Sequence, residues 1–343
     1  MSKRKNTMSI QSKSKNKRQT RPVIKLENAP SVNSIGDLIE LGKSINFYKN
    51  LDTVMLWRIT PYLEKLDKMI GMESLKESVF FQIIYYLKGM HTKNRNEEYL
   101  HTLIMGAPGG GKTTVAKIIG KIYQAMGVLS HNGPFKIAYR DDFVAEYLGQ
   151  TAIKTKKLLQ SCLGGVLFVD ELYSLGPGVK DKDSFSKEAL DTLTGFLSEH
   201  KNDFCFIGAG YEEDIKKCFM GVNKGLERRF QWIHKIDEYN SEELSDIFLK
   251  MVKEMNWHVN IDTKDIINLI KEDKKLFKHA GGSVEVFISK MKMVHAKRVF
   301  SLDKEHMFVF TKKDMTNAID LIKKNSLNKD DDDNDRFMCS MYM

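Results

Sequence analysis

Residues 106–113 read Gly-Ala-Pro-Gly-Gly-Gly-Lys-Thr and fit the pattern G-x-x-x-x-G-K-S/T in full. The loop follows the apolar segment 101–105, which we expect to form a strand, and precedes a helical run over 115–123. A strand, this loop and a helix in that order are the context that identifies a phosphate-binding loop. Glycines are needed because backbone N–H groups must turn inward around phosphate oxygens, in conformations that a Cβ atom disfavours. The stretch therefore predicts a P-loop nucleotide-binding domain.

The residues of this loop have distinct expected roles. The N-terminus of the following helix adds the positive end of its dipole to the phosphate site. We expect Lys112 to reach the β- and γ-phosphates of ATP and the Thr113 hydroxyl to coordinate Mg²⁺. The candidate nucleotide-binding residues are Gly106, Ala107, Pro108, Gly109, Gly110, Gly111, Lys112, Thr113 and Thr114.

An acidic pair follows a second apolar segment, Val166-Leu-Phe-Val-Asp170-Glu171. Its four apolar residues predict a buried strand, and the two carboxylates fall at the carboxyl end of that strand, where open α/β sheets bind ligands. Asp170 is the expected second partner of Mg²⁺, directly or through water. Glu171 is the expected general base, which orients and deprotonates the attacking water.

Strands and helices alternate up to about residue 236, which predicts an α/β fold with a parallel sheet covered by helices on both faces. The expected strands of this five-stranded sheet are 101–105, 135–139, 165–169, 203–208 and 230–236. After Tyr239 the apolar spacing is helical throughout and predicts a small all-helical lid domain. Ser241 is the expected N-cap of its first helix, and Thr311 with Asp314 is typical of a capping box before a late helix.

The predicted organisation has five parts: a disordered basic tail (1–30), a helical N-terminal segment (31–66), the nucleotide-binding domain (67–238), the helical lid domain (239–326) and an acidic disordered tail (327–343). The net charge of +9 comes from the first 26 residues, which carry nine basic side chains and no acid. Outside them, 45 basic residues balance 45 acidic ones. A nucleic-acid partner, if there is one, is therefore expected at the basic tail.

Composition excludes several other classes of protein. The sequence contains no run of 18 or more apolar residues, so we expect no membrane span. The basic N-terminus lacks the apolar stretch of a secretory signal. The four cysteines show no C-x-x-C spacing, which argues against disulfides and zinc. We expect an intracellular, cytoplasmic protein, with a nuclear location as the alternative that the basic tail leaves open.

The sequence resembles the AAA+ ATPases, and within them the CbbX/CfxQ group, which includes red-type rubisco activases and the sporulation protein SpoVK. The resemblance covers roughly residues 60–300. The segments that carry it are Gly71-Met-Glu-Ser-Leu-Lys76, the loop at 106–114, Tyr147-Leu-Gly-Gln-Thr-Ala152, Gly164-Gly-Val-Leu-Phe-Val-Asp-Glu-Leu-Tyr-Ser174, Glu188-Ala-Leu-Asp-Thr-Leu193, Ala209-Gly-Tyr211 and Gly225-Leu-Glu-Arg-Arg-Phe230.

The resemblance implies a ring, in this group a hexamer. It places Tyr147 in the central pore, where an aromatic side chain grips an extended protein client. It also implies that an arginine finger enters the neighbouring subunit's site. Arg229 is the better match because it directly precedes an apolar strand, and Arg228 is the second candidate. Such an arginine is worth about 10³–10⁵ in rate in well-studied systems.

Two segments depart from what the resemblance implies. Ala209-Gly210-Tyr211 stands where many AAA+ enzymes have a polar sensor, and it contains no Asn or Thr, although the group itself has Ala-Gly-Tyr here. In the lid, His279-Ala-Gly-Gly-Ser283 stands where the group carries Gly-Asn-Ala-Arg, so the lid arginine is missing. Ser283 can cap a helix there, but it cannot supply a cation.

The favoured interpretation is an ATP-hydrolysing AAA+ motor that remodels a macromolecular partner, most simply a protein, as a ring-shaped oligomer. One alternative is a nucleic-acid-associated ATPase of the loader or initiator type. Another is a nucleotide-dependent scaffold with weak hydrolysis, which the missing lid arginine suggests. The identity of the client does not follow from these residues.

Overall fold

The computed structural model describes residues 25–44, 46–92, 99–147, 149–176, 184–221 and 224–325. Most of the predicted basic tail and all of the acidic tail lie outside these residues. Regular structure begins earlier than expected, within the segment assigned to the basic tail. There β1 (Lys25–Leu26) pairs in parallel with β2 (Phe47–Tyr48), and the Ala29 amide donates to the side chain of Asn50 at 2.8 Å.

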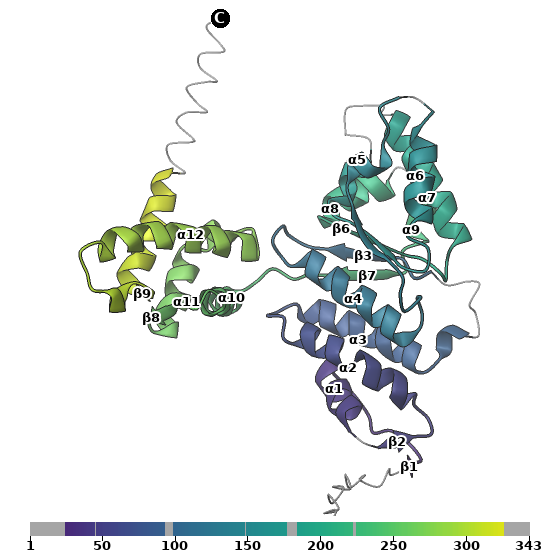
Figure 1. The fold of residues 1–343 in the computed structure, drawn as a ribbon, viewed down its shortest axis with the longest axis horizontal. Coiled ribbons are helices and arrows are strands. Elements are labelled where there is room, and N and C mark those ends of the chain that lie inside the picture. The colour runs from purple at the N-terminus through teal and green to yellow at the C-terminus, as the bar shows by residue number, and fades with distance from the viewer. Residues whose placement is uncertain are drawn as a thin grey trace, which may run out of the picture.

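Three helices precede the sheet: α1 (Ile35–Lys43), α2 (Thr53–Asp67) and α3 (Glu73–Leu87), followed by the short η1 (Met90–Thr92). A capping box between Ser34 and Asp37 starts α1. Helix α2 buries Leu56, Ile59 and Leu63 and packs against both α1 and α4 (Lys112–Met126). The N-terminal helices therefore extend the core on one face of the sheet (Figure 1).

The central sheet has five parallel strands in the order β4-β5-β6-β3-β7, which confirms the predicted fold class. The strands are β3 (Thr102–Met105), β4 (Phe135–Ala138), β5 (Val166–Val169), β6 (Cys205–Gly210) and β7 (Trp232–Lys235). Every residue of β3, β5 and β6 is buried, because helices cover the sheet on both sides.

The two faces of the sheet carry separate apolar cores. Phe168 and Ile207 face the core that α2, α3 and α4 share, whereas Leu167 and Phe206 face the other. The elements beyond that second face are α5 (Arg140–Phe143), α6 (Thr151–Gln160), η2 (Leu172–Leu175), α7 (Ser184–Glu199), α8 (Glu212–Asp214), the π-helix η3 (Ile215–Met220) and α9 (Lys224–Glu227). None of the helices described is both long and apolar enough to cross a membrane.

The C-terminal region is helical and is joined to the sheet by the segment after β7 (Figure 1). It contains α10 (Ser241–Glu254), α11 (Thr263–Glu272), η4 (Lys274–Phe277), α12 (Ala280–Val299), η5 (Lys304–His306) and a helix over 312–325. Two short strands that sequence analysis did not predict, β8 (His258–Asn260) and β9 (Val309–Thr311), pair in parallel.

The expected N-cap at Ser241 was off by one residue. Asn240 is the N-cap of α10, because its side chain accepts from the amide of Glu243 at 2.8 Å. The Glu243 carboxylate accepts from the Asn240 amide at 2.7 Å, which completes a capping box. Ser241 is the first residue of the helix instead, where it follows the cap directly.

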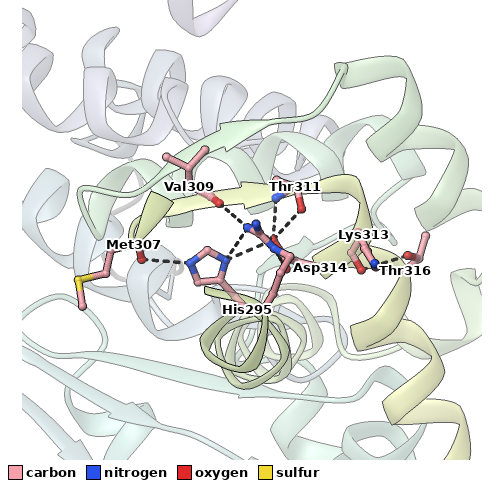
Figure 2. Close-up of polar contacts among 8 residues, drawn as sticks. His295, Met307, Val309, Thr311, Lys313, Asp314 and Thr316 are labelled. Carbon is pink, nitrogen blue, oxygen red and sulfur yellow. Dashed lines mark hydrogen bonds and ion pairs between the residues drawn. The ribbon is translucent and has the colours of Figure 1, made fainter. Parts of the chain in front are cut away.

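A buried charge network joins α12 to β9 and the helix after it (Figure 2). Asp314 accepts from Nε of Arg298 at 2.7 Å and from both the amide and the hydroxyl of Thr311, at 2.8 and 2.9 Å. His295 lies 3.2 Å from the same carboxylate through Nδ1 and 3.0 Å from the Met307 carbonyl through Nε2. The bond from the Thr311 amide to the Asp314 carboxylate is one half of the predicted capping box. The Thr311 hydroxyl also donates to this carboxylate.

Replacement of Asp314 by alanine should destabilise the helical C-terminal region by about 3–5 kcal/mol, because it leaves the charge of Arg298 without its partner. Burial opposes ionisation of this carboxyl, but hydrogen bonds from Arg298 and Thr311 outweigh it, so the pKa of Asp314 is lowered. Its contribution is therefore present above the pKa of the unfolded chain and is lost as the pH falls through the lower, folded value.

Urea unfolding at neutral and acidic pH measures both effects. Lys313→Ala, at an exposed neighbouring position, is the control and should stay within about 0.5 kcal/mol of the unmodified chain. Equal stability of Asp314→Ala and Lys313→Ala would contradict the importance of the network.

Candidate nucleotide-binding site

The predicted phosphate loop leaves the sheet at the carboxyl end of β3. Its first residue is fixed by β6, because the Gly106 amide donates to the Gly210 carbonyl at 3.1 Å. Gly109 and Gly111 have φ values of +68° and +84°, the left-handed region that favours glycine. Helix α4 begins directly after Gly111, so its unpaired N-terminal amides lie at the loop. The loop therefore has the strand–turn–helix geometry that binds phosphate.

Lys112 lies inside the loop and is only 8% exposed. Its Nζ donates to the carbonyls of Gly106 and Ala107, at 3.1 and 2.8 Å. Burial lowers the pKa of Lys112, and the carboxylates of Asp170 and Glu171 act in the opposite direction. Lys112 and the acidic pair are therefore close enough to interact electrostatically, as the predicted site requires.

Thr113 and Asp170 meet across the gap between α4 and β5. The Thr113 hydroxyl donates to Oδ2 of Asp170 at 3.3 Å, and both side chains are partly buried. A hydroxyl and a carboxylate are hard oxygen ligands, which suit Mg²⁺ when nucleotide phosphates complete its coordination. The residues present therefore fit the metal that the loop implies. Among the described residues, no cluster of three or more His, Cys, Asp or Glu side chains could hold a metal ion.

Glu171 has an unusual backbone for a residue with a side chain, with φ +50° and ψ +47°. Its amide donates to Oδ1 of Asp170 at 3.0 Å, and it serves as the N-cap of η2. Left-handed non-glycine residues cost free energy and cluster at functional sites. Glu171 is exposed and directly follows Asp170 at the carboxyl end of β5.

A pocket of about 510 Å³ opens beside the loop, between the end of β7 and the lid. Tyr239 lies on its wall, donates to the Gly110 carbonyl at 3.4 Å, and has a pKa that burial raises to about 12. The full lining consists of Ala107, Gly110, Ile236, Asp237, Glu238, Tyr239, Lys274, Lys275, Phe277, Lys278 and Ala280. The loop, the strand end and the lid thus share one cavity, large enough for the nucleoside part of a nucleotide.

Besides the Tyr239 hydroxyl, the lid approaches the loop closely at Gly109, where backbone faces backbone. A Cβ atom on Gly109 would lie 2.4 Å from the His279 carbonyl oxygen and 2.6 Å from the Gly282 amide nitrogen. Ser283 is not the cap of α12, contrary to expectation: His279 is the N-cap, and Ser283 lies inside the helix, where its Oγ accepts from the His279 amide at 3.0 Å. The only arginine of residues 239–325 is Arg298, which is bound to Asp314. The guanidinium of Arg298 is therefore held in the network around Asp314.

Arg229 lies at the opposite edge of the sheet from the phosphate loop. It precedes β7, whose first residue pairs with the first residue of β3 in a parallel register. Its guanidinium donates to Oγ of Ser198 at 2.7 Å and to the Gly225 carbonyl, whereas Arg228 is exposed. Burial lowers the pKa of His101, just before β3, to about 4, and the charge of Arg229 contributes to this. Neither arginine is therefore placed to serve the nucleotide site of its own chain.

Tyr147 lies in the loop between α5 and α6 and is 67% exposed. Its carbonyl accepts from the Gln150 amide at 3.3 Å, which closes a turn before α6. The aromatic side chain is thus presented to solvent, away from both apolar cores.

Sequence analysis quoted two tyrosines at the carboxyl edge of the sheet but gave neither of them a role in the site. Tyr211 follows β6 directly and lies beside Lys112, with Nζ 5.8 Å from the ring centroid. Tyr173, in η2, lies next to Tyr211 with ring centroids 6.3 Å apart. The available signal was their place in the sequence: Tyr173 comes two residues after Glu171, and Tyr211 ends the segment that stands at the sensor position.

A phosphate loop and an acidic pair on neighbouring parts of one parallel sheet define a P-loop nucleoside triphosphatase. The AAA family model, described as ATPase family associated with various cellular activities, matches residues 102–231. A putative cfxQ-like protein of Acanthamoeba polyphaga mimivirus is 38% identical over 289 residues, which cover 81% of this chain and 69% of the relative. The chain belongs to the AAA+ ATPases, in the CbbX/CfxQ group, and hydrolyses ATP to ADP and phosphate.

A second relative and a solved structure agree with this assignment. The chloroplastic ribulose bisphosphate carboxylase/oxygenase activase of Cyanidioschyzon merolae is 32% identical over 246 residues, covering 70% of this chain and 79% of the relative. The crystal structure of the FIGL-1 AAA domain in complex with ADP superposes with a TM-score of 0.52 at 16% identity. That match covers 74% of this chain and 82% of the other, and it supports the fold.

The contact between loop and lid yields a test with a matched control. Gly109→Ala should weaken nucleotide binding at least about tenfold, because the new methyl group would displace the lid backbone or distort the loop. Gly127→Ala also introduces a side chain at positive φ, +75°, but has no atom within 4 Å of the new Cβ. It should cost only the backbone strain, about 1–2 kcal/mol of stability.

Equilibrium titration with a fluorescent ADP analogue measures the affinity, and thermal unfolding measures the strain. Equal nucleotide affinities of the two variants would show that the lid contact has no role in binding.

Proposed function

We propose that this ATPase works as a ring-shaped oligomer, in its simplest form a hexamer, that uses Mg²⁺-bound ATP to remodel a protein partner. Its membership of the AAA+ family supports action on a macromolecule. The name of the algal relative, an activase of ribulose bisphosphate carboxylase/oxygenase, supports a protein as the class of partner. The identity of the client is not part of this proposal.

The position of Arg229 is the observation that supports a ring-shaped oligomer. Parallel strands place all their amino ends at one edge of a sheet and all their carboxyl ends at the other. Arg229 lies at the amino edge, and the phosphate loop lies at the carboxyl edge, separated by the four residues of β3, roughly 13 Å. A guanidinium from this edge reaches a triphosphate only in another copy of the chain, and a closed ring gives every site such a neighbour.

Within one site, the chain's own residues divide the work. Lys112 and the loop amides hold the phosphates and neutralise part of their charge. Thr113 and Asp170 would hold the magnesium ion, which supplies further charge neutralisation at the phosphates. Glu171 accepts a proton from the attacking water. The neighbour's arginine completes the site, so hydrolysis depends on assembly.

Tyr147 is the proposed contact with the client. It is exposed on a loop that neither apolar core requires, and an aromatic ring offers a flat surface that accepts many sequences. The basic tail remains the proposed contact in the alternative with nucleic acid, and it lies mostly outside the described residues. The scaffold alternative is favoured by one observation, the contact of the lid through backbone at Gly109 without an arginine.

Mixing of two inactive variants tests the ring. Arg229→Ala should bind ATP normally and lose hydrolysis by about 10³-fold, since its site lacks the charge from the neighbour. Lys112→Ala should lose its own site but still offer an intact arginine. A mixture of the two should recover part of the activity, measured as phosphate release at increasing protein concentration.

Arg228→Ala in the same mixture shows which arginine acts, and Arg58→Ala, an exposed arginine on α2, is the control that should leave activity unchanged. No recovery in any mixture, together with activity that is independent of protein concentration, would exclude an arginine acting between subunits.

Binding of the client by Tyr147 can be measured separately from hydrolysis in the Glu171→Gln variant. This variant should bind ATP without hydrolysing it. With ATP bound, this variant should retain a chemically unfolded protein probe, and the additional change Tyr147→Ala should weaken retention at least about tenfold. Tyr139→Ala removes another exposed tyrosine, 61% accessible before α5, and should not weaken it. Retention that is equal in all three proteins would contradict a role for Tyr147.

A further inference from the structure

A second cavity lies in the helical C-terminal region and shares no lining residue with the pocket beside the phosphate loop. It has a volume of about 620 Å³ and lies between residues 293–298 of α12 and residues 313–324 of the helix that follows β9. The ion pair of Arg298 with Asp314, at 2.7 Å, joins these two helices within the buried network of Figure 2. The two walls are thus fixed to each other, and the cavity between them is named the lid groove.

Lysine side chains from both helices line the lid groove. Lys297 comes from α12, and Lys313 and Lys324 come from the last helix. All three residues are exposed, and no ion pair within the described part of the chain includes any of them. The acidic residue that lines the groove is Asp320. The groove therefore has an excess of positive charge and favours an anionic occupant.

Apolar surface lies beside these charges. Met293 is 59% exposed on α12, and Val294 and Leu321 also line the groove. Ion pairs on a surface contribute little by themselves, because water and salt screen them. An apolar side chain that covers exposed apolar surface adds free energy that salt does not screen. The occupant that fits best therefore offers carboxylates together with apolar side chains.

The chain itself contains a segment with both properties, residues 330–338, named here the acidic segment. Five of its residues are aspartates, at 330–333 and 335, and Phe337 and Met338 follow them after Arg336. The segment lies outside the described residues, and it begins six residues after Lys324, which lines the groove. The tail at the other end of the chain, with nine basic side chains and no acid, has the wrong sign of charge for this groove.

The acidic segment is long enough to return along the groove. From Lys313 to Lys324 a helix rises about 17 Å, at 1.5 Å per residue. From Asn325, an extended chain reaches about 17 Å at Asp330 and about 26 Å at Asp333. The carboxylates can therefore reach lysines at either end of the helix. The short connection also raises the effective concentration of the segment to about the millimolar range, so weak contacts are sufficient.

We propose that the acidic segment binds in the lid groove of its own chain. Its carboxylates pair with the three lysines of the groove, and its phenylalanine and methionine cover the exposed apolar surface beside them. An anionic partner of the lid must then displace this segment before it can bind. The groove shares no residue with the nucleotide site, so this inference does not rest on the proposed function.

Zero-length carbodiimide cross-linking of the full chain tests the contact, because it joins a carboxylate to an ammonium group only where the two meet. At low salt, mass spectrometry should find amide bonds from the acidic segment to Lys297, Lys313 and Lys324. The yield should fall at least about tenfold in about 1 M salt, where the screening length is about 3 Å.

Charge reversal in the groove provides the matched comparison, with the cross-link at Lys313 as the readout. Lys297→Glu combined with Lys324→Glu should lower this yield at least about fivefold, because the carboxylates then meet like charges. Lys253→Glu combined with Lys264→Glu changes two exposed lysines of the lid outside the groove and should keep the yield within about twofold.

The apolar contact has its own variant. Phe337→Ser leaves every carboxylate in place and should lower the yield at Lys313 at least about threefold, because apolar burial is lost. An unchanged yield would overturn this half of the proposal. All variants should bind a fluorescent ADP analogue within about twofold of the unmodified chain, which shows that they are folded.

Mixing normal chains with isotopically heavy chains before cross-linking identifies whose groove is occupied. Cross-links that join peptides of the same isotopic form support binding within one chain. Cross-links between the two forms in the statistical proportion would show that the segment binds a second copy, and would overturn the proposal. It is also overturned if no cross-link reaches the three lysines at low salt, or if the groove and control variants give equal yields. The groove would then belong to an anionic partner from outside the chain.

Discussion

The hydrogen-bonded register of β5, β6 and β3 is the constraint on which the nucleotide site depends. Three parallel strands end together, and each delivers one element: the acidic pair after β5, Tyr211 after β6 and the phosphate loop after β3. Because every residue of these strands is buried, a slip of one residue would turn core side chains toward the wrong face. The apolar packing that stabilises the fold therefore also fixes the spacing of the strand ends that carry the predicted site residues.

The same parallel arrangement divides the chemistry between two edges of the sheet. The groups that bind phosphate lie at the carboxyl edge, and Arg229 is held at the amino edge by Ser198 and the Gly225 carbonyl. No small movement brings one edge to the other, since the buried strands lie between them. The proposed dependence on a neighbouring copy would thus be a consequence of strand direction.

The sequence was sufficient for the sheet, the phosphate loop and the acidic pair, because each depends on local patterns of apolar residues, glycines and charges. It was insufficient for β6, predicted at 203–208 and observed at Cys205–Gly210. The segment Gly208-Ala-Gly210 has little apolar surface, yet it continues the strand because its glycines leave room for Leu172 and Tyr173. That shift brings Tyr211 to the site. The place of Tyr211 beside Lys112 depends on β6 lying between β5 and β3, and chain order does not reveal lateral order.

The lid shows how a missing charge changes the coupling between nucleotide and conformation. An arginine on a lid senses the phosphates through charge, an interaction that acts over several ångströms and weakens with salt. Here the lid meets the loop through backbone atoms at Gly109, His279 and Gly282, a contact that is lost within a fraction of an ångström. A change in the loop as the phosphates are cleaved can therefore pass to the lid by steric contact at Gly109 and through the Tyr239 hydrogen bond to Gly110. Such coupling acts over a short range but needs no cation. A lid that places no arginine at the nucleotide is therefore compatible with an otherwise complete ATPase site.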